Sequence, residues 1–375
     1  MQTRQFGVTE FENSDSSNFQ RHGEDLIQRY DEISRLNRID WSTNLRLQNE
    51  IGRGGQGTVY LAERTGADGF NLPVAAKIFS PEPYSNPNDY DQDMRRIGQI
   101  ASRIARIENE NLLNVYHFLN RDRIRIMIME WIDGFDLRRL LTPRMLGLVQ
   151  DRVSDKRWSY IQERLVSAGK IQPKLNACQA IHVLRDCLVA LASLHECGII
   201  HGDIKPANIM INRFGKAKLI DTGTASDEDF PARFRACTPA YSSPRVLLGE
   251  SPSIASDLVS LGYILLELVC GRPIFSQAEN LDQLIDEKRN ILNSISNILP
   301  PETEHAEALI EICTALIAND GIQSSGNTID SKLASADCFI QQIDRWELLV
   351  ANPNDLRFWT QELLELPASE PEAPI

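Results

Sequence analysis

Positive charge is scarce in this 375-residue sequence, which has 39 lysine and arginine residues against 52 aspartate and glutamate residues. The formal net charge is −13 at pH 7. A polyphosphate backbone or an anionic membrane attracts the opposite sign of charge, so neither is expected as the main partner. We therefore predict no nucleic-acid partner.

Long hydrophobic runs are lacking as well. The longest nearly apolar stretch, residues 258–271, contains Glu267 and is shorter than the roughly 20 residues that a membrane-spanning helix needs. Residues 1–10 lack the basic start and the apolar centre of a secretory signal. We expect a chain without a membrane span that stays in the cytoplasm.

Closely spaced cysteine pairs are missing too. The seven cysteines are odd in number and include no Cys-x-x-Cys, which predicts reduced thiols rather than a disulfide framework. The six scattered histidines predict no zinc site. With 42% hydrophobic and 24% charged residues, the composition is that of an ordinary folded chain, long enough for two lobes with extensions.

Apolar periodicity divides the chain into four parts. We expect an N-terminal extension with one amphipathic helix (1–44), a small lobe (45–132), a larger lobe (133–350) and a C-terminal helix with a flexible tail (351–375). The helix of the extension is predicted over 24–37 from apolar residues at helical spacing, namely Leu26, Tyr30, Ile33 and Leu36.

Within the small lobe the pattern is mainly strand-like, and one helix over 91–107 interrupts it. Its apolar face carries four isoleucines, Ile97, Ile100, Ile104 and Ile107. The larger lobe is mainly helical, and its apolar residues 255–270 predict a buried core helix. The charged region 144–174 predicts an inserted helix on the surface.

The first group of residues with a chemical role is a glycine loop. Gly52, Gly54 and Gly57 are followed directly by a strand, so their backbone amides can approach phosphate oxygens without side chains in the way. A dinucleotide fold needs a helix after the glycines and an acidic residue about 20 positions further on. Here Lys77 stands at that distance, which favours a lysine that reaches α- and β-phosphates held under the glycine loop.

A second group lies in the loop 201–208 and just beyond it. Asp203 is placed to accept or orient a hydroxyl proton, and Lys205 is placed to neutralise a moving γ-phosphate. The amide oxygen of Asn208 and the carboxylate of Asp221 are hard oxygen ligands, which suit Mg²⁺. Together these residues predict phosphoryl transfer.

In this order the motifs closely resemble the eukaryotic-type (Hanks-type) Ser/Thr protein kinase family, over about residues 45–345. The resemblance implies an α+β, bilobal fold with a small, mainly antiparallel β lobe carrying one helix and a larger α-helical lobe, and it implies that ATP and Mg²⁺ bind between the lobes. Lys205 and the sequence Thr238-Pro239-Ala240-Tyr241 resemble the Ser/Thr-specific branch, so protein Ser/Thr hydroxyls are the expected acceptors.

The resemblance also assigns roles to individual residues. Asp203, Lys205 and Lys77 are the expected catalytic residues, and Asn208 and Asp221 are the expected metal ligands. Asp257 is expected to bond to the backbone of the catalytic loop. The residues expected to contact ATP are Ile51, Gly52, Gly54, Gly57, Val59, Ala75, Lys77, Met129, Glu130, Ile132 and Asp136.

Four positions depart from the family pattern. Gly202 replaces an arginine that commonly pairs with a phosphorylated activation segment, so we expect activity without that phosphorylation. Thr222 replaces the phenylalanine that follows the metal-binding aspartate in the family. We therefore expect the in/out switch of the motif Asp221-Thr222-Gly223 to be altered. The helix 91–107 has no glutamate that could pair with Lys77, and the acid that lies best on its isoleucine face is Asp93. Arg245 replaces a glutamate, and we expect reversal to glutamate to destabilise the fold.

Three functions remain open at this level. The leading one is an active Ser/Thr protein kinase with ATP and a protein as substrates and a regulatory protein as a further candidate partner. The second is a pseudokinase that binds nucleotide and acts as a scaffold, and the third is a kinase of small molecules. Position alone offers four candidate autophosphorylation sites, Thr224, Ser226, Thr238 and Ser242.

Overall fold

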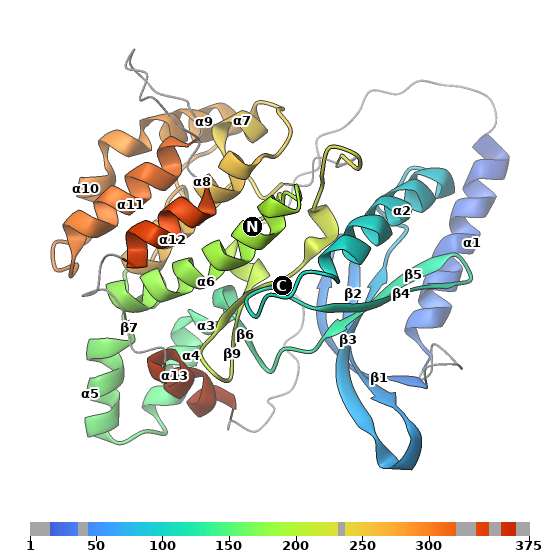
Figure 1. Ribbon diagram of the computed structural model, residues 1–375, viewed down its shortest axis with the longest axis horizontal. Helices are drawn as coiled ribbons and strands as arrows, with labels where there is room; N and C mark the ends of the chain where they lie inside the picture. Colours follow the sequence, from blue (N-terminus) through green and yellow to red (C-terminus); the bar gives the residue numbers. More distant parts are fainter. Residues whose placement is uncertain (1–15, 37–43, 232–236, 320–334, 345–353, 365–375) are drawn as a thin grey trace. The chain divides into compact units, whose positions relative to one another are not determined.

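The computed structural model describes residues 16–36, 44–231, 237–319, 335–344 and 354–364. The chain forms two compact units (Figure 1). One unit comprises Met1–Glu108, Leu113–Trp131 and Asp229–Arg233, and the other comprises Asn109–Leu112, Ile132–Glu228 and Phe234–Ile375.

An antiparallel sheet of five strands forms the first unit, in the order β1-β2-β3-β5-β4. Its strands are β1 (Leu45–Gly54), β2 (Gly57–Thr65), β3 (Asn71–Phe79), β4 (Val115–Arg121) and β5 (Ile124–Glu130). The turn from β1 to β2 requires glycine, because Gly57 has φ of +140° and a Cβ there would lie 2.0 Å from the carbonyl oxygen of Ile78. The expected β lobe is confirmed.

Helix α2 (Pro87–Ile104) belongs to the same unit and buries Ile97, Ile100 and Ile104. It begins earlier than the isoleucine spacing predicts because the side chain of Asn86 accepts a hydrogen bond from the Asp89 amide, and Pro87 occupies the first turn. The helix ends at Ile104, so Ile107 lies beyond it.

Helix α1 (Ser16–Ser34) packs against α2 and β5. As expected, Leu26, Tyr30 and Ile33 are buried, whereas Leu36 follows the helix end and is 39% exposed. The Tyr30 hydroxyl shares a buried hydrogen bond of 3.0 Å with Thr58 Oγ1 on β2. The helix is therefore joined to the strand that follows the glycine loop.

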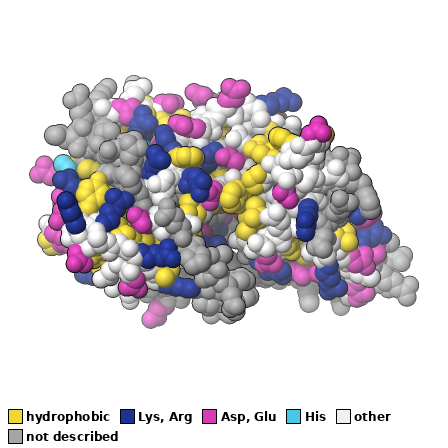
Figure 2. Space-filling view, turned by 90° about the horizontal axis from the view of Figure 1, so that it is seen from below, with side chains coloured by type: hydrophobic (Ala, Val, Ile, Leu, Met, Phe, Trp, Pro, Cys, Tyr) yellow, Lys and Arg dark blue, Asp and Glu magenta, His cyan; other side chains and the backbone are white. Residues whose placement is uncertain are grey.

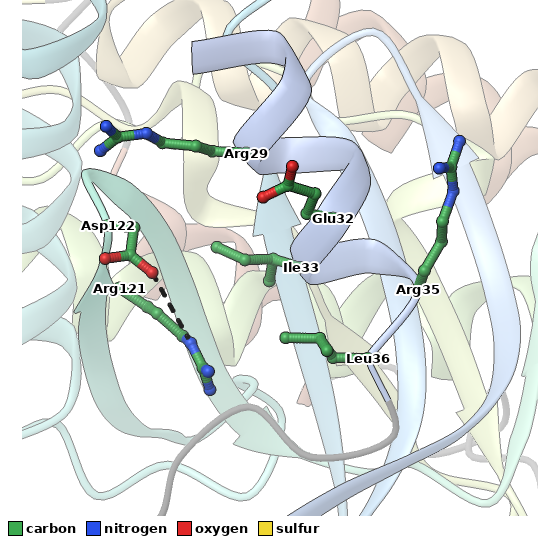
Figure 3. A pocket seen from close by; sticks show the side chains of 7 residues that line it. All are labelled: Arg29, Glu32, Ile33, Arg35, Leu36, Arg121 and Asp122. Carbon is green, nitrogen blue, oxygen red and sulfur yellow. Dashed lines mark ion pairs between the residues drawn. The ribbon is translucent and has the colours of Figure 1, made fainter. Parts of the chain in front are cut away.

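A pocket of about 470 Å³ lies between the C-terminal half of α1 and the turn after β4 (Figure 3). Arg29 comes to it from α1, Arg35 follows the end of α1, and Arg121 comes from β4. Glu32 and Asp122 line it as well, so its charges are of both signs.

Two apolar helices form the centre of the second unit, α6 (Ala177–Glu196) and α8 (Ile254–Cys270). Every residue of α8 from Ala255 to Cys270 is buried, as expected for the core helix. Among the described helices, α6 is long and apolar enough to cross a membrane, but most of it is buried inside the unit, as in the core helix of a globular domain.

Shorter elements surround these two helices. The strands are β6 (Gly134–Asp136), β7 (Val166–Ser167), β8 (Lys174–Leu175), β9 (Ile209–Asn212) and β10 (Ala217–Leu219). The helices are α3 (Leu137–Leu140), α4 (Pro143–Gln150), α5 (Asp155–Arg164), α7 (Pro244–Leu247), α9 (Leu281–Asn290), α10 (Ile295–Ile298), α11 (Ala306–Ala318), α12 (Ala336–Asp344) and α13 (Asn354–Leu364). This helical unit agrees with the expected larger lobe.

The region 144–174 differs from the single surface helix that its charge predicts. It contains two helices, α4 and α5, and a short antiparallel ladder of β7 and β8. Leu146, Val149 and Ile161 are buried, and α4 packs against α13. Thr142 and Ser154 cap the two helices, which explains why the segment breaks into two.

Both signs of charge are interspersed on the face that Figure 2 displays. Lysine and arginine side chains lie among aspartate and glutamate side chains there, and neither sign covers that face.

The contact between α1 and the sheet generates a stability prediction. Leu26→Ala is expected to lower the free energy of unfolding by about 2–5 kcal/mol, because the deletion leaves a cavity under a side chain that is 2% exposed. The matched control is the neighbouring Ile27→Ala, because Ile27 is 37% exposed and a surface change costs about 0.5 kcal/mol or less. Chemical denaturation measures both variants. Equal losses would contradict this packing of α1.

Candidate functional site

Lys77 is a buried lysine on β3, with 6% of its surface exposed. Its Nζ donates a hydrogen bond of 2.9 Å to Oε1 of Gln56, which lies in the turn between Gly54 and Gly57. The glycine loop and the lysine that follows it in the sequence are thus joined by a side-chain contact. Sequence reasoning missed Gln56, although its place inside the glycine motif was a usable signal.

Asp93, the acid that the sequence offers as a partner for Lys77, is engaged elsewhere. One carboxylate oxygen accepts from the Tyr84 hydroxyl at 2.6 Å, and the other accepts from Nε of Arg96, also at 2.6 Å. Burial, with the Asp93 charge as the next contribution, raises the pKa of Tyr84 well above its usual value. Asp93 therefore secures α2 to the segment before it.

Four of the residues expected to contact ATP share one face of the sheet. Val59 lies directly opposite Lys77, and Ala75 lies directly opposite Met129. Since Lys77 and Ala75 are two residues apart on β3, all four side chains lie on the same face. Thr58, which bonds to Tyr30 of α1, faces the other way.

The other expected contact residues are divided between the units. Ile51, Gly52 and Gly54 lie on β1, Gly57 begins β2, and Glu130 ends β5, all in the first unit. Ile132 and Asp136 belong to the second unit. Asp136 caps α3 through the Arg139 amide, and burial raises its pKa above the usual value for a carboxyl group.

Asp203 lies within a triangle of three side chains in the second unit. Lys205 Nζ lies 2.6 Å from Asp203 Oδ2 and donates to Thr238 Oγ1 at 3.1 Å. The Thr238 hydroxyl in turn donates to Asp203 Oδ1 at 2.8 Å. Sequence reasoning treated Thr238 only as part of a docking segment and as a candidate phosphorylation site, and it missed this hydroxyl as a partner of Asp203.

One of the two expected metal ligands, Asn208, lies close to the same carboxylate. The Asn208 side-chain amide donates to the backbone oxygen of Asp203 at 2.8 Å and to its Oδ2 at 3.2 Å. The backbone oxygen of Asn208 accepts from the Ile220 amide at 2.9 Å, which fixes the residue before Asp221 beside Asn208.

These residues fit a magnesium ion. Because the Asn208 amide group points its hydrogens at Asp203, its oxygen remains as the ligand, and Asp221 supplies a carboxylate. Asp221 has a left-handed backbone with φ of +61°, a strained conformation typical of functional sites. In the described parts of the chain no group of three or more His, Cys, Asp or Glu residues is placed to hold a metal ion.

The backbone before Asp203 is held by Asp257 of α8, as expected. One oxygen of this 1% exposed carboxylate accepts from the His201 amide and the other from the Gly202 amide, each at 2.9 Å. His195 Nε2 lies 3.0 Å from the first oxygen. Gly202 has φ of +77°, so a larger residue would be strained there.

The segment around Thr222 is compact. Thr222 is buried, and the Thr224 hydroxyl donates to the backbone oxygen of His201 at 3.1 Å. A second candidate phosphorylation site, Ser242, donates through its hydroxyl to the Thr238 backbone oxygen at 3.0 Å. Ser226 is 6% exposed.

Arg245 is not a buried structural contact. It pairs with Glu250 at 2.6 Å, and both side chains are 51% exposed. An exposed pair of this kind contributes little to stability. The expectation that Arg245→Glu destabilises the fold stays a prediction, now of a small effect, because the reversal would bring two exposed carboxylates together. Residues 320–334 lie outside the described part of the chain.

Glu267 is the buried acid inside the apolar helix α8. Tyr241 donates its hydroxyl hydrogen to Oε2 at 2.8 Å, and Gln172 donates to Oε1 at 3.1 Å. Burial raises the pKa of Glu267 above its usual value. The carboxyl group thus anchors the segment that contains Thr238 to the core of the unit.

A family model described as the protein kinase domain matches residues 45–324. Curated relatives include the serine/threonine-protein kinase PrkC of Bacillus subtilis, 29% identical over 226 residues, with 59% of this chain and 30% of the relative covered. The kinase PkaA of Streptomyces coelicolor is 28% identical over 253 residues (64% and 41% covered), and PknL of Mycobacterium tuberculosis is 28% identical over 269 residues (70% and 59% covered). The chain thus spans less than two thirds of the length of each.

The environment of Glu267 generates a pH prediction. Its raised pKa means that the folded protein keeps a proton that the unfolded chain releases near pH 4.5, so this group's contribution to stability falls as pH rises through the folded pKa. Glu267→Gln removes that dependence. The difference in melting temperature, variant minus wild type, is expected to become more positive as the pH rises above 4.5. Parallel pH profiles of the two proteins would contradict the raised pKa.

Proposed function

Since the chain belongs to the protein kinase family, we propose that it transfers the γ-phosphate of ATP to serine or threonine hydroxyls of proteins. The observation that carries the proposal is the arrangement around Asp203, whose carboxylate lies 2.6 Å from Lys205 Nζ and within reach of the Asn208 amide. The names of the relatives, which are serine/threonine-protein kinases, support the choice of acceptor.

In this proposal each group has one role. Asp203 orients the acceptor hydroxyl and accepts its proton, a contribution of about 10²–10⁴ in rate for a positioned base. Lys205 neutralises charge that develops on the transferred phosphoryl group. The amides of the glycine loop and Lys77 hold the phosphates of ATP. Asn208 and Asp221 hold Mg²⁺, which when bound supplies charge neutralisation on the phosphates.

The pseudokinase alternative rests on the missing acid in α2. The contact between Lys77 and Gln56 weakens that argument, because the lysine is oriented by the glycine loop itself. A protein that only binds partners also has no physical use for Asp203, Lys205 and Asn208 in this arrangement.

A cytoplasmic location is part of the proposal. All seven cysteines are free thiols, as suits a reducing compartment. A regulatory protein remains a candidate partner.

Phosphate transfer tests the proposed activity directly. With Mg-ATP and a generic basic protein, mass spectrometry is expected to detect transfer by the wild type and a loss of about 10²-fold or more in Asp203→Ala and Lys77→Met. The control is Lys216→Met, which removes a lysine that pairs with Glu110 at the surface. Aminoglycoside and choline-like acceptors should stay unmodified.

The opposite outcome is equally defined. Absence of transfer by the wild type, together with a nucleotide-dependent stabilisation of about 2.7 kcal/mol at 100 times Kd, would establish the pseudokinase instead.

Activity without prior phosphorylation is a separate prediction. Phosphatase-treated protein, with its mass verified, is expected to keep its full transfer rate, because Gly202 offers no side chain to a phosphate on the segment. Thr238→Glu is expected to lower the rate, since it places a second carboxylate against Asp203. A many-fold increase in Thr238→Glu, or loss of activity after phosphatase, would overturn this prediction.

A further inference from the structure

Lys288 is a buried lysine on α9 that the expected site residues do not include. It is 2% exposed, and its Nζ donates to the backbone oxygens of Ala240 at 2.9 Å and Ser242 at 2.8 Å. The ammonium also lies 4.1 Å from the ring centre of Tyr263 and 4.3 Å from that of Phe275. A buried cation is retained only where such acceptors offset its lost hydration.

The two carbonyl groups belong to the turn 238–243, which begins with the partner of Asp203. The oxygen between them, that of Tyr241, accepts from the Ser260 hydroxyl of α8 at 2.8 Å. Three consecutive carbonyl groups are therefore fixed by side chains from two helices.

A continuous set of contacts leads from Lys288 to the catalytic carboxylate. Lys288 fixes Ser242, whose hydroxyl donates to the Thr238 backbone oxygen at 3.0 Å. The Thr238 side chain then donates to Asp203 Oδ1 at 2.8 Å. The position of α9 beside α7, which follows the turn directly, is visible in Figure 1.

Arg245 is not the buried cation of this region. It follows the turn 238–243 and is half exposed in its pair with Glu250. The buried cation that contacts the turn comes from α9 instead. Lysine suits the place because its compact ammonium has three donors and no acceptor, and two of the donors serve diverging carbonyl groups.

We propose that Lys288 is a positioning residue of the acceptor site. It fixes the turn 238–243, on which an extended peptide with a Ser or Thr acceptor docks, and it thereby keeps the Thr238 hydroxyl on Asp203 without help from a phosphate group. This inference rests on the proposed kinase function and adds a determinant of its protein-substrate site.

Steady-state kinetics of Lys288→Met test the inference. Methionine keeps the apolar stem between the rings but removes both donors. The KM for a Ser/Thr peptide is expected to rise roughly tenfold or more, the worth of a hydrogen bond from a charged group, while the KM for ATP stays unchanged. The matched control is Arg289→Met, one residue further on α9, which removes an exposed arginine paired with Asp286.

A second measurement does not depend on activity. The amides of Tyr241 and Ser242 both donate to the Thr238 oxygen, so hydrogen exchange at these amides is expected to accelerate in Lys288→Met. The amides of His201 and Gly202, bonded to Asp257, should keep their protection. Ser242→Ala removes the hydroxyl that donates to the Thr238 oxygen, and it is expected to raise the peptide KM in the same way. This variant replaces Lys288→Met in the test if Lys288→Met does not fold.

Two results would overturn the inference. One is an unchanged exchange rate at Tyr241 and Ser242, and the other is an equal change of the KM values for peptide and ATP, which a purely structural role would produce. If the wild type transfers no phosphate at all, the proposed function fails, and the exchange measurement alone then decides whether Lys288 fixes the turn.

Discussion

The buried carboxylate of Asp257 is the constraint on which the loop 201–208 depends. A charge that is 1% exposed is costly unless donors surround it, and here the His201 amide, the Gly202 amide and the His195 ring supply them. Because Asp203 follows within two residues, its direction is set by this contact. Gly202 belongs to the same arrangement, and its φ of +77° is a backbone conformation in which the arginine common at that position would be strained.

Two departures from the family pattern have the same physical character. The helix α2 has no glutamate to pair with Lys77, and Gln56 of the glycine loop accepts a hydrogen bond from Lys77 instead. Arg245 is half exposed, and Lys288 of α9 donates to the docking turn. In the first case the acceptor comes from a different element from the one that the pattern predicts, and in the second case the cation does. The departures therefore indicate a changed set of contacts rather than a loss of the site.

The motifs predict the fold class and the order of the chemical groups because turns, caps and metal ligands depend on local residue types. Contacts between distant residues were beyond that reasoning. Thr238 meets Asp203 across 35 positions and Lys288 meets Ala240 across 48, and no local pattern encodes either pair. The ends of helices were not predicted either. The helix α2 begins at Pro87, because the side chain of Asn86 caps it there. The high charge of the region 144–174 predicted one surface helix, whereas the structure has two capped helices with buried apolar residues.

The central claim is that this chain has a Ser/Thr-specific acceptor site that is assembled without phosphorylation. The most direct measurement begins with protein that mass spectrometry shows to carry no phosphate. This protein is incubated with Mg-ATP and a mixed library of Ser, Thr and Tyr peptides, and the type of residue that becomes phosphorylated is then identified. The account predicts phosphoserine and phosphothreonine and no phosphotyrosine. Phosphate on tyrosine, or on no peptide until the protein itself has been phosphorylated, would contradict it.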